Sequence, residues 1–99
     1  MQKRTDTRTK IVATIGPASE SPEVLEGLFR AGVDVVRLNL SHGSLESHVE
    51  RLHRVREAAD RADAVVAVLA DLPGPKVRSG QFPDGGAELV AGSILLTTP

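Results

Sequence analysis

The chain contains no cysteine among its 99 residues, and its aromatic content of 2% consists of two phenylalanines. The absence of cysteine excludes disulfides, thiolate metal sites and cysteine nucleophiles. With so few aromatic rings, the chain offers no stacking platform for the bases of single-stranded nucleic acid. Any hydrophobic core must therefore be built from aliphatic side chains.

Neither sign of charge predominates, and no long hydrophobic run is present. Lys and Arg number 12 against 13 Asp and Glu, a net charge of −1, so no overall field favours nucleic acid or an anionic membrane. The longest strongly apolar run, Ala64 to Ala70, is far shorter than the roughly 20 residues of a membrane span. The polar opening, Met1 to Lys10, lacks the apolar core of a signal peptide. We therefore expect a cytoplasmic protein without nucleic-acid or membrane partners.

The sequence does contain an alternation of β-branched runs and amphipathic segments. Short apolar runs predict three buried strands, at residues 10–15, 33–40 and 64–72. Between them, Ser21 and Ser44 stand where the caps of two helices are expected, and Pro22 suits the first helical position. The helices are predicted over residues 22–31 and from Ser44 to about residue 62. This order predicts an α/β fold with a parallel sheet covered on both faces.

The second predicted helix carries an apolar stripe that predicts its buried face. The stripe consists of Leu45, Val49, Leu52, either Val55 or Arg56, and Ala59, spaced by three and four residues. On that assignment His48 and His53 fall at solvent-facing or edge positions. The basic residues of the helix then form a solvated surface: Arg51, Arg54 and Arg56.

After Asp71 the character of the chain changes. Residues 72–78 hold two prolines and a glycine, and Pro83-Asp84-Gly85-Gly86 predicts the turn of a hairpin between residues 77–82 and 87–90. A further short strand is predicted at residues 94–97. Three parallel strands cannot close a barrel, so we expect the opening of a larger α/β enzyme that stops within a β-rich insertion.

A polar row marks the end of the second predicted strand. Arg37, Asn39 and Ser41 are two residues apart, so in an extended chain they face one side. A guanidinium suits phosphate, and amide and hydroxyl oxygens suit a hard cation. Asp71, at the end of an apolar strand, also needs a cationic partner or a metal. An internal salt bridge between Arg37 and Asp71 explains the same residues, and spacing alone does not decide between these alternatives.

Three longer segments resemble the opening of the pyruvate kinase family. They are TKIVATIGPAS (9–19), GVDVVRLNLSHG (32–43) and DLPGPKVRSG (71–80). The resemblance implies that residues 1–72 form the first three β/α units of a (β/α)8 TIM barrel and that residues 73–99 begin a small β-barrel lid domain. It also implies phosphoryl transfer from phosphoenolpyruvate to ADP in glycolysis, with magnesium, in many members potassium, and a homotetrameric parent enzyme.

The resemblance further implies roles for individual residues. Arg37 matches the arginine that contacts the transferring phosphoryl group. The nucleotide phosphates would be bound by Asn39, Leu40, Ser41, His42 and Arg78. The ligands of the monovalent cation would be the side chains of Asn39, Ser41 and Asp71 and the carbonyl of Leu72. Lys76 stands where potassium-dependent members carry glutamate, so its ammonium is a candidate substitute for the potassium ion.

The family's catalytic lysine and magnesium-binding carboxylates come from later strands, so no divalent-metal ligand is expected within these 99 residues. We therefore expect the chain to be inactive alone. One alternative is a non-catalytic remnant that binds phosphate or nucleotide. A different phosphate-handling barrel enzyme is another alternative, which the length and order of the three motifs disfavour.

Overall fold

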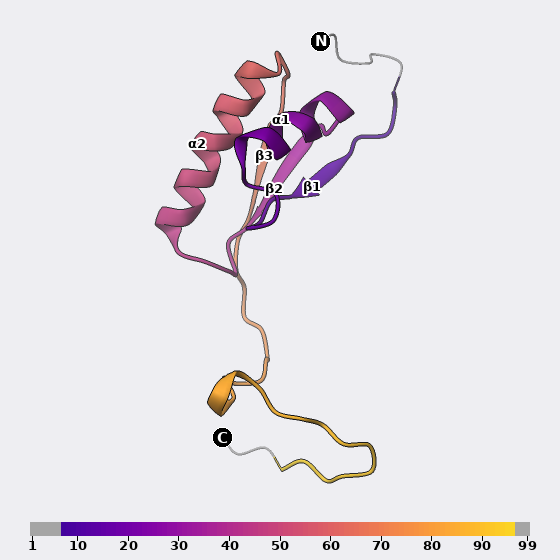
Figure 1. Cartoon of the computed structure of the whole chain (residues 1–99), viewed down its shortest axis with the longest axis vertical. Helices are drawn as coiled ribbons and strands as arrows, with labels where there is room; N and C mark the ends of the chain where they lie inside the picture. The colour runs from indigo at the N-terminus through magenta and orange to yellow at the C-terminus, as the bar shows by residue number, and fades with distance from the viewer. Residues whose placement is uncertain (1–6, 97–99) are drawn as a thin grey trace.

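The computed structural model describes residues 7–96, and its elements follow the expected order. They are β1 (Val12–Thr14), α1 (Pro22–Ala31), β2 (Val35–Asn39), α2 (Leu45–Arg61), β3 (Ala67–Asp71) and a 3-10 turn, η1 (Pro83–Gly85). The strands form one parallel sheet in the order β1-β2-β3 (Figure 1). The prediction of an α/β fold with a parallel sheet is confirmed. No helix among the described residues is long and apolar enough to cross a membrane.

Local signals account for the helix boundaries. The Oγ atom of Ser21 accepts a hydrogen bond from the Val24 N–H at 3.4 Å, and α1 ends at Gly32, whose φ of 111° is left-handed. Ser44 caps α2 in the same way and accepts from the Ser47 N–H at 3.2 Å. Both predicted caps are therefore confirmed.

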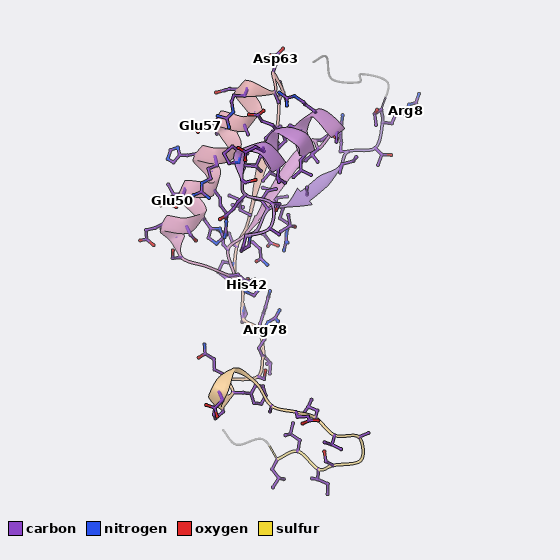
Figure 2. All side chains as sticks on the ribbon, in the orientation of Figure 1. Arg8, His42, Glu50, Glu57, Asp63 and Arg78 are labelled. Atoms are coloured by element: carbon purple, nitrogen blue, oxygen red, sulfur yellow. The ribbon has the colours of Figure 1, made fainter. Side chains whose placement is uncertain are left out.

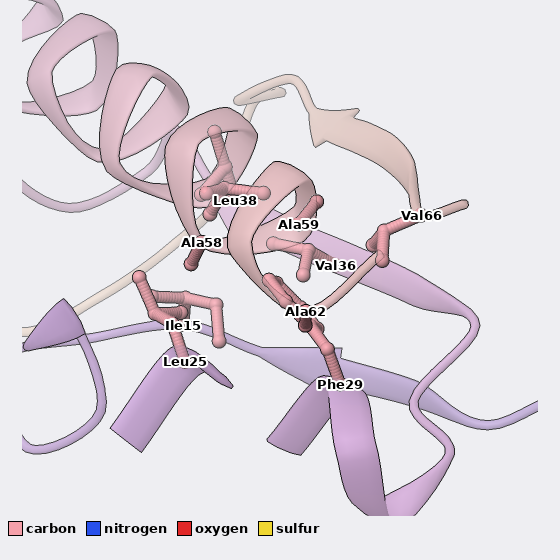
Figure 3. Packing of buried hydrophobic residues seen from close by; sticks show 10 residues of the cluster. Ile15, Leu25, Phe29, Val36, Leu38, Ala58, Ala59, Ala62 and Val66 are labelled. Atoms are coloured by element: carbon pink, nitrogen blue, oxygen red, sulfur yellow. The ribbon is translucent and has the colours of Figure 1, made fainter. Parts of the chain in front are cut away.

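Both helices pack on the same face of the sheet. Val36 and Leu38 of β2 are buried against Leu25 and Phe29 of α1 and against the C-terminal half of α2 (Figure 3). The buried residues of that half are Val55, Ala58 and Ala59, with Ala62 just beyond the helix. Right-handed crossovers between strands added in one direction place successive helices on one side of a sheet.

The other face of the sheet is not covered by any segment within residues 7–96. Val12 of β1 is 53% exposed and Leu69 of β3 is 44% exposed on that face. The expectation of a sheet covered on both faces is therefore wrong for the described residues. The second face is uncovered because the strand order continues in one direction, so both right-handed crossovers place their helices on the first face.

The buried face of α2 differs from the predicted stripe at its N-terminal end. Leu45 is 71% exposed and Val49 is also exposed, whereas His48 is 5% exposed. The predicted stripe holds at Leu52, Val55 and Ala59, and His48 takes the place of Leu45 and Val49 at its N-terminal end. All three positions precede Leu52 by three, four or seven residues, so helical spacing allows any of them on this face. The expectation of a solvent-facing His48 is thus wrong, whereas His53 is exposed as predicted.

Residues 72–96 run away from the sheet as a long loop that contains only η1 (Figure 1). The predicted hairpin is not formed, and residues 94–96 are not a strand; Thr97, the last residue of that predicted strand, lies outside the described residues. An isolated two-stranded hairpin is at best marginally stable, and none of the three described strands pairs with this segment. Residues 1–6 of the predicted barrel segment and 97–99 of the predicted lid segment also lie outside the described part.

Candidate functional site

The polar residues gather at the carboxyl ends of the three strands. Arg37 lies on β2 with its side chain on the open face, because Val36 and Leu38 on either side are buried under the helices. Its Nε and Nη2 atoms donate to Oδ2 of Asp71 at 2.9 and 2.5 Å, and Nη1 donates to Oγ1 of Thr14 at 3.1 Å. The salt bridge considered from the sequence is therefore present, and together with the hydrogen bond to Thr14 it lets the Arg37 side chain link all three strands.

The salt bridge leaves part of the Arg37 guanidinium free. A guanidinium has five N–H donors, and Asp71 and Thr14 take three of them, one on each nitrogen. One N–H on Nη1 and one on Nη2 have no partner within residues 7–96. A planar pair of donors on two nitrogens suits two oxygens of a phosphate. Salt bridge and phosphate contact are thus compatible at this residue.

Thr14 was not singled out from the sequence. Only the sheet register would have indicated its role: Thr14 is the neighbour of Arg37 on the adjacent strand, so both side chains face the same side. The register could not be set from the sequence of the first strand, because the predicted run of residues 10–15 is longer than the strand that forms.

The segment after β2 forms a turn instead of continuing the extended row. Asn39 is the last strand residue, and its Oδ1 atom accepts a hydrogen bond from the Ser41 N–H at 3.1 Å. The Leu40 N–H donates to the carbonyl of Asp71 at 3.0 Å, and the His42 N–H reaches the Asn39 carbonyl at 3.4 Å. Ser41 and His42 are therefore exposed at the sheet edge, and the polar row expected to reach Ser41 ends at Asn39.

Oxygen donors suited to a hard cation lie at the same edge. The register places Asn39 opposite Asp71, and Leu72 follows directly. Oδ2 of Asp71 is occupied by Arg37, and Oδ1 of Asn39 by the Ser41 N–H. Amide, carboxylate, hydroxyl and carbonyl oxygens are nevertheless the donor types that hard cations prefer. The described residues hold no cluster of three or more His, Asp or Glu side chains fit for a metal ion.

Lys76 and Arg78 are not brought to this edge. Figure 2 shows His42 at the end of the sheet from which the chain departs, with Arg78 further along the departing segment. Both basic residues are exposed, and residues 73–75 run without the turn that would fold Lys76 back towards Asp71. Neither side chain forms a hydrogen bond or ion pair within the described part of the chain.

Behind the edge, α2 is tied to the loop that follows β1. Nε of Arg51 donates to Oε2 of Glu20 at 2.5 Å, and Nη1 of Arg54 lies 3.3 Å from Oε1. The hydrogen bond from Arg51, together with the charges of both arginines, holds the pKa of Glu20 below its ordinary value. Arg56 donates to the carbonyl of Val66 at 3.0 Å. Arg56 is exposed, as expected for a solvated face, but all three arginines also form structural contacts.

Comparison with known proteins identifies the family. The model of the pyruvate kinase barrel domain matches residues 6–98. Pyruvate kinase of Agrobacterium vitis is 49% identical over 92 residues, which are 93% of this chain and 19% of that protein. Pyruvate kinase of Staphylococcus aureus is 48% identical over 91 residues, 92% of this chain and 16% of that protein.

The fold comparison agrees with the sequence comparison. The crystal structure of Cryptosporidium parvum pyruvate kinase superimposes with a TM-score of 0.74 at 42% identity, over 79% of this chain and 16% of that one. The chain is thus part of an α/β barrel-type domain of a phosphotransferase family. It belongs to the pyruvate kinase family, and it spans less than a fifth of the length of the relatives it matches. The alternative of a non-catalytic remnant is not favoured.

Proposed function

We propose that this chain forms part of the phosphate-handling edge of a pyruvate kinase that transfers a phosphoryl group from phosphoenolpyruvate to ADP. The observation that carries the proposal is the Arg37 guanidinium, which Asp71 and Thr14 orient while two of its N–H donors stay free. Phosphoryl transfer depends chiefly on positioning and on neutralising the charge of the transferring group. Arg37 would supply both functions, as a fixed fork of donors aimed at the phosphoryl oxygens.

The nucleotide would bind beside Arg37, through the turn at the end of β2. Asn39, Leu40, Ser41 and His42 make up this turn, which leads into the N-terminus of α2, where backbone N–H groups and the helix dipole favour anions. Arg78 would add a charge-assisted contact to the nucleotide phosphates once its segment lies over the sheet edge. The turn thus orients the nucleotide and Arg78 contributes the charge.

A monovalent cation would be held by Asn39, Ser41, Asp71 and the carbonyl of Leu72. Its chemistry would be to offset negative charge beside a polyanionic substrate. Lys76 is our proposed substitute for it, because an ammonium on a long flexible stem supplies the same charge. Magnesium would be held by carboxylates outside these residues.

In the complete enzyme, this chain would be the first three β/α units of a (β/α)8 barrel and the start of a lid domain at residue 73. The uncovered face of the sheet would then line the barrel interior. A homotetrameric, cytoplasmic enzyme of glycolysis is the corresponding expectation for the assembled protein, and light scattering on the purified enzyme measures its mass.

The test is a coupled assay of pyruvate formation by the complete enzyme, meaning these residues together with the rest of the barrel. We expect magnesium-dependent turnover with phosphoenolpyruvate and ADP. Arg78→Ala should raise the KM for ADP and leave that for phosphoenolpyruvate unchanged. Arg8→Ala is the matched control, since Arg8 lies at the far end of the sheet (Figure 2). A folded complete enzyme without turnover would refute the proposed function.

A further inference from the structure

A buried histidine of α2 contacts the backbone of the turn that follows β2, where the nucleotide is proposed to bind. His48 lies in the first turns of α2 with 5% of its surface exposed, and its Nε2 atom is hydrogen-bonded to the backbone carbonyl of His42. We propose that His48 is a positioning residue that orients the peptide between His42 and Gly43, so that the Gly43 N–H donates to a phosphate oxygen of the nucleotide. This inference rests on the proposed function.

The His42 carbonyl and the Gly43 N–H belong to the same peptide bond, so the direction of one sets the direction of the other. In a trans peptide the C=O and the following N–H point in opposite directions within one plane. The chain has no cis peptide bonds among its described residues, so a His42 carbonyl turned towards His48 directs the Gly43 N–H away from α2. That N–H has no acceptor within residues 7–96. A backbone N–H whose peptide is held in place on its carbonyl side, and which has no acceptor of its own, suits a phosphate oxygen.

The turn is packed tightly enough to hold this orientation. Gly43 has a φ of 79°, which disfavours any other residue. A Cβ atom there would lie 3.0 Å from Oγ of Ser47 and 3.5 Å from Nε2 of His48. Ser47 is itself fixed, because its hydroxyl donates to the Ser44 carbonyl at 2.8 Å. Helix and turn therefore approach so closely that the His42 carbonyl meets the imidazole directly.

A purely structural role would not favour histidine at this position. Donation to a carbonyl places the proton on Nε2, which leaves Nδ1 as an acceptor. Nδ1 is buried and has no hydrogen-bond partner among the described residues, which costs free energy. The next residues along the same helix face, Leu52 and Val55, are apolar, and a leucine at position 48 would avoid that cost. The hydrogen bond to His42 is what a histidine adds.

The test compares ADP binding to variants of the complete enzyme by isothermal titration calorimetry. His48→Leu removes the donor and fills the buried position with an apolar side chain, and it should weaken ADP binding about fivefold to tenfold, the scale of one hydrogen bond. The KM for phosphoenolpyruvate should not change. His48→Gln should bind within about twofold of wild type, because the glutamine Nε2 is as many bonds from Cβ as that of histidine. His53→Leu, at an exposed position of the same helix, is the matched control and should change nothing.

Each outcome decides the inference. ADP affinity in His48→Leu equal to wild type, with only a lower melting temperature, would overturn it, and so would equal losses for both substrates. If His48→Leu does not fold, His48→Gln is compared with His48→Asn, whose amide is too short to reach the His42 carbonyl. We expect the asparagine variant to bind ADP more weakly, and equal affinities would overturn the inference. A wild-type enzyme that binds no ADP would refute the proposed function instead.

Discussion

Substituting Arg37 by alanine in the complete enzyme distinguishes a catalytic role of this residue from a structural one. The side chain has two relationships in this structure: it is hydrogen-bonded to Asp71 and Thr14, and it keeps two free N–H donors. The hydrogen bonds to Asp71 and Thr14 contribute to folding and orient the guanidinium, whereas the free donors are expected to contribute to the rate of phosphoryl transfer. The two losses are expected to differ greatly in size, so they can be measured independently.

The loss in the free energy of unfolding is expected to be small. The side chains of Arg37 and Asp71 are 32% and 45% exposed, and ion pairs accessible to solvent contribute about 0–1 kcal/mol. The catalytic loss is expected to be large, because removing one oriented donor from a developing charge costs about 10²–10³ in kcat. Arg37→Ala should therefore lower kcat by about that factor while lowering the free energy of unfolding by about 1 kcal/mol or less.

The assay is coupled pyruvate formation, normalised to the folded fraction measured by circular dichroism. Thr14→Val, which removes only the hydrogen bond to Nη1, should lower kcat by about fivefold to tenfold. Arg30→Ala is the control, because Arg30 is an exposed residue of α1 that pairs only with Glu26 within the described residues. If Arg37→Ala unfolded the enzyme while its folded fraction kept wild-type kcat, the role of Arg37 would be structural and our reasoning wrong.

Three further predictions follow from other features. The 99-residue chain alone should form no pyruvate above a protein-free control and should elute as aggregates in size-exclusion chromatography, because one sheet face is uncovered. The wild-type enzyme should be active without potassium, and Lys76→Glu should make potassium necessary; strong activation of the wild type by potassium would contradict this. Glu20, whose pKa is lowered mainly by the hydrogen bond from Arg51, stabilises the fold above the ordinary pKa of a glutamate, and this contribution is lost as the pH falls through its lower folded-state pKa. The difference in melting temperature between wild type and Glu20→Gln should therefore shrink on acidification, and a constant difference would argue against it.

The parts of the fold that local signals specify were predictable from the sequence. Ser21 and Ser44 set helix starts through contacts within a few residues, so no knowledge of the tertiary structure was needed. The ion pair of Arg37 with Asp71 was also foreseen as an alternative, since Arg37 lies near the end of β2 and Asp71 ends the neighbouring β3. Parallel strands bring such ends to one edge whatever the detailed register.

The features that were missed depend on rotation, register or missing neighbours. His48 was assigned to the surface because Leu45 and Val49 fit the helical period equally well, and only packing on the sheet decides the rotation of α2. Thr14 required the register of β1 against β2. The predicted hairpin after residue 76 required other strands to pair with, and the described residues contain no strand besides β1, β2 and β3, none of which pairs with this segment.

The charges at the sheet edge explain why the departing segment matters to the site. Arg37 and Asp71 neutralise each other, so the edge orients donors but contributes no net positive charge. Phosphoenolpyruvate and ADP, the substrates proposed above, are both polyanions, and on that proposal bringing them together would require cations that the edge itself lacks. Lys76 and Arg78 lie on the segment that leaves the edge, exposed and unpaired within residues 7–96. On the proposed function, the orienting groups are thus built into the sheet, whereas the compensating charge would come from this segment or from bound ions. Substitutions at Arg37 should consequently change kcat. Substitutions at Lys76 and Arg78 should instead change how the activity depends on the concentrations of salt, monovalent cation and ADP.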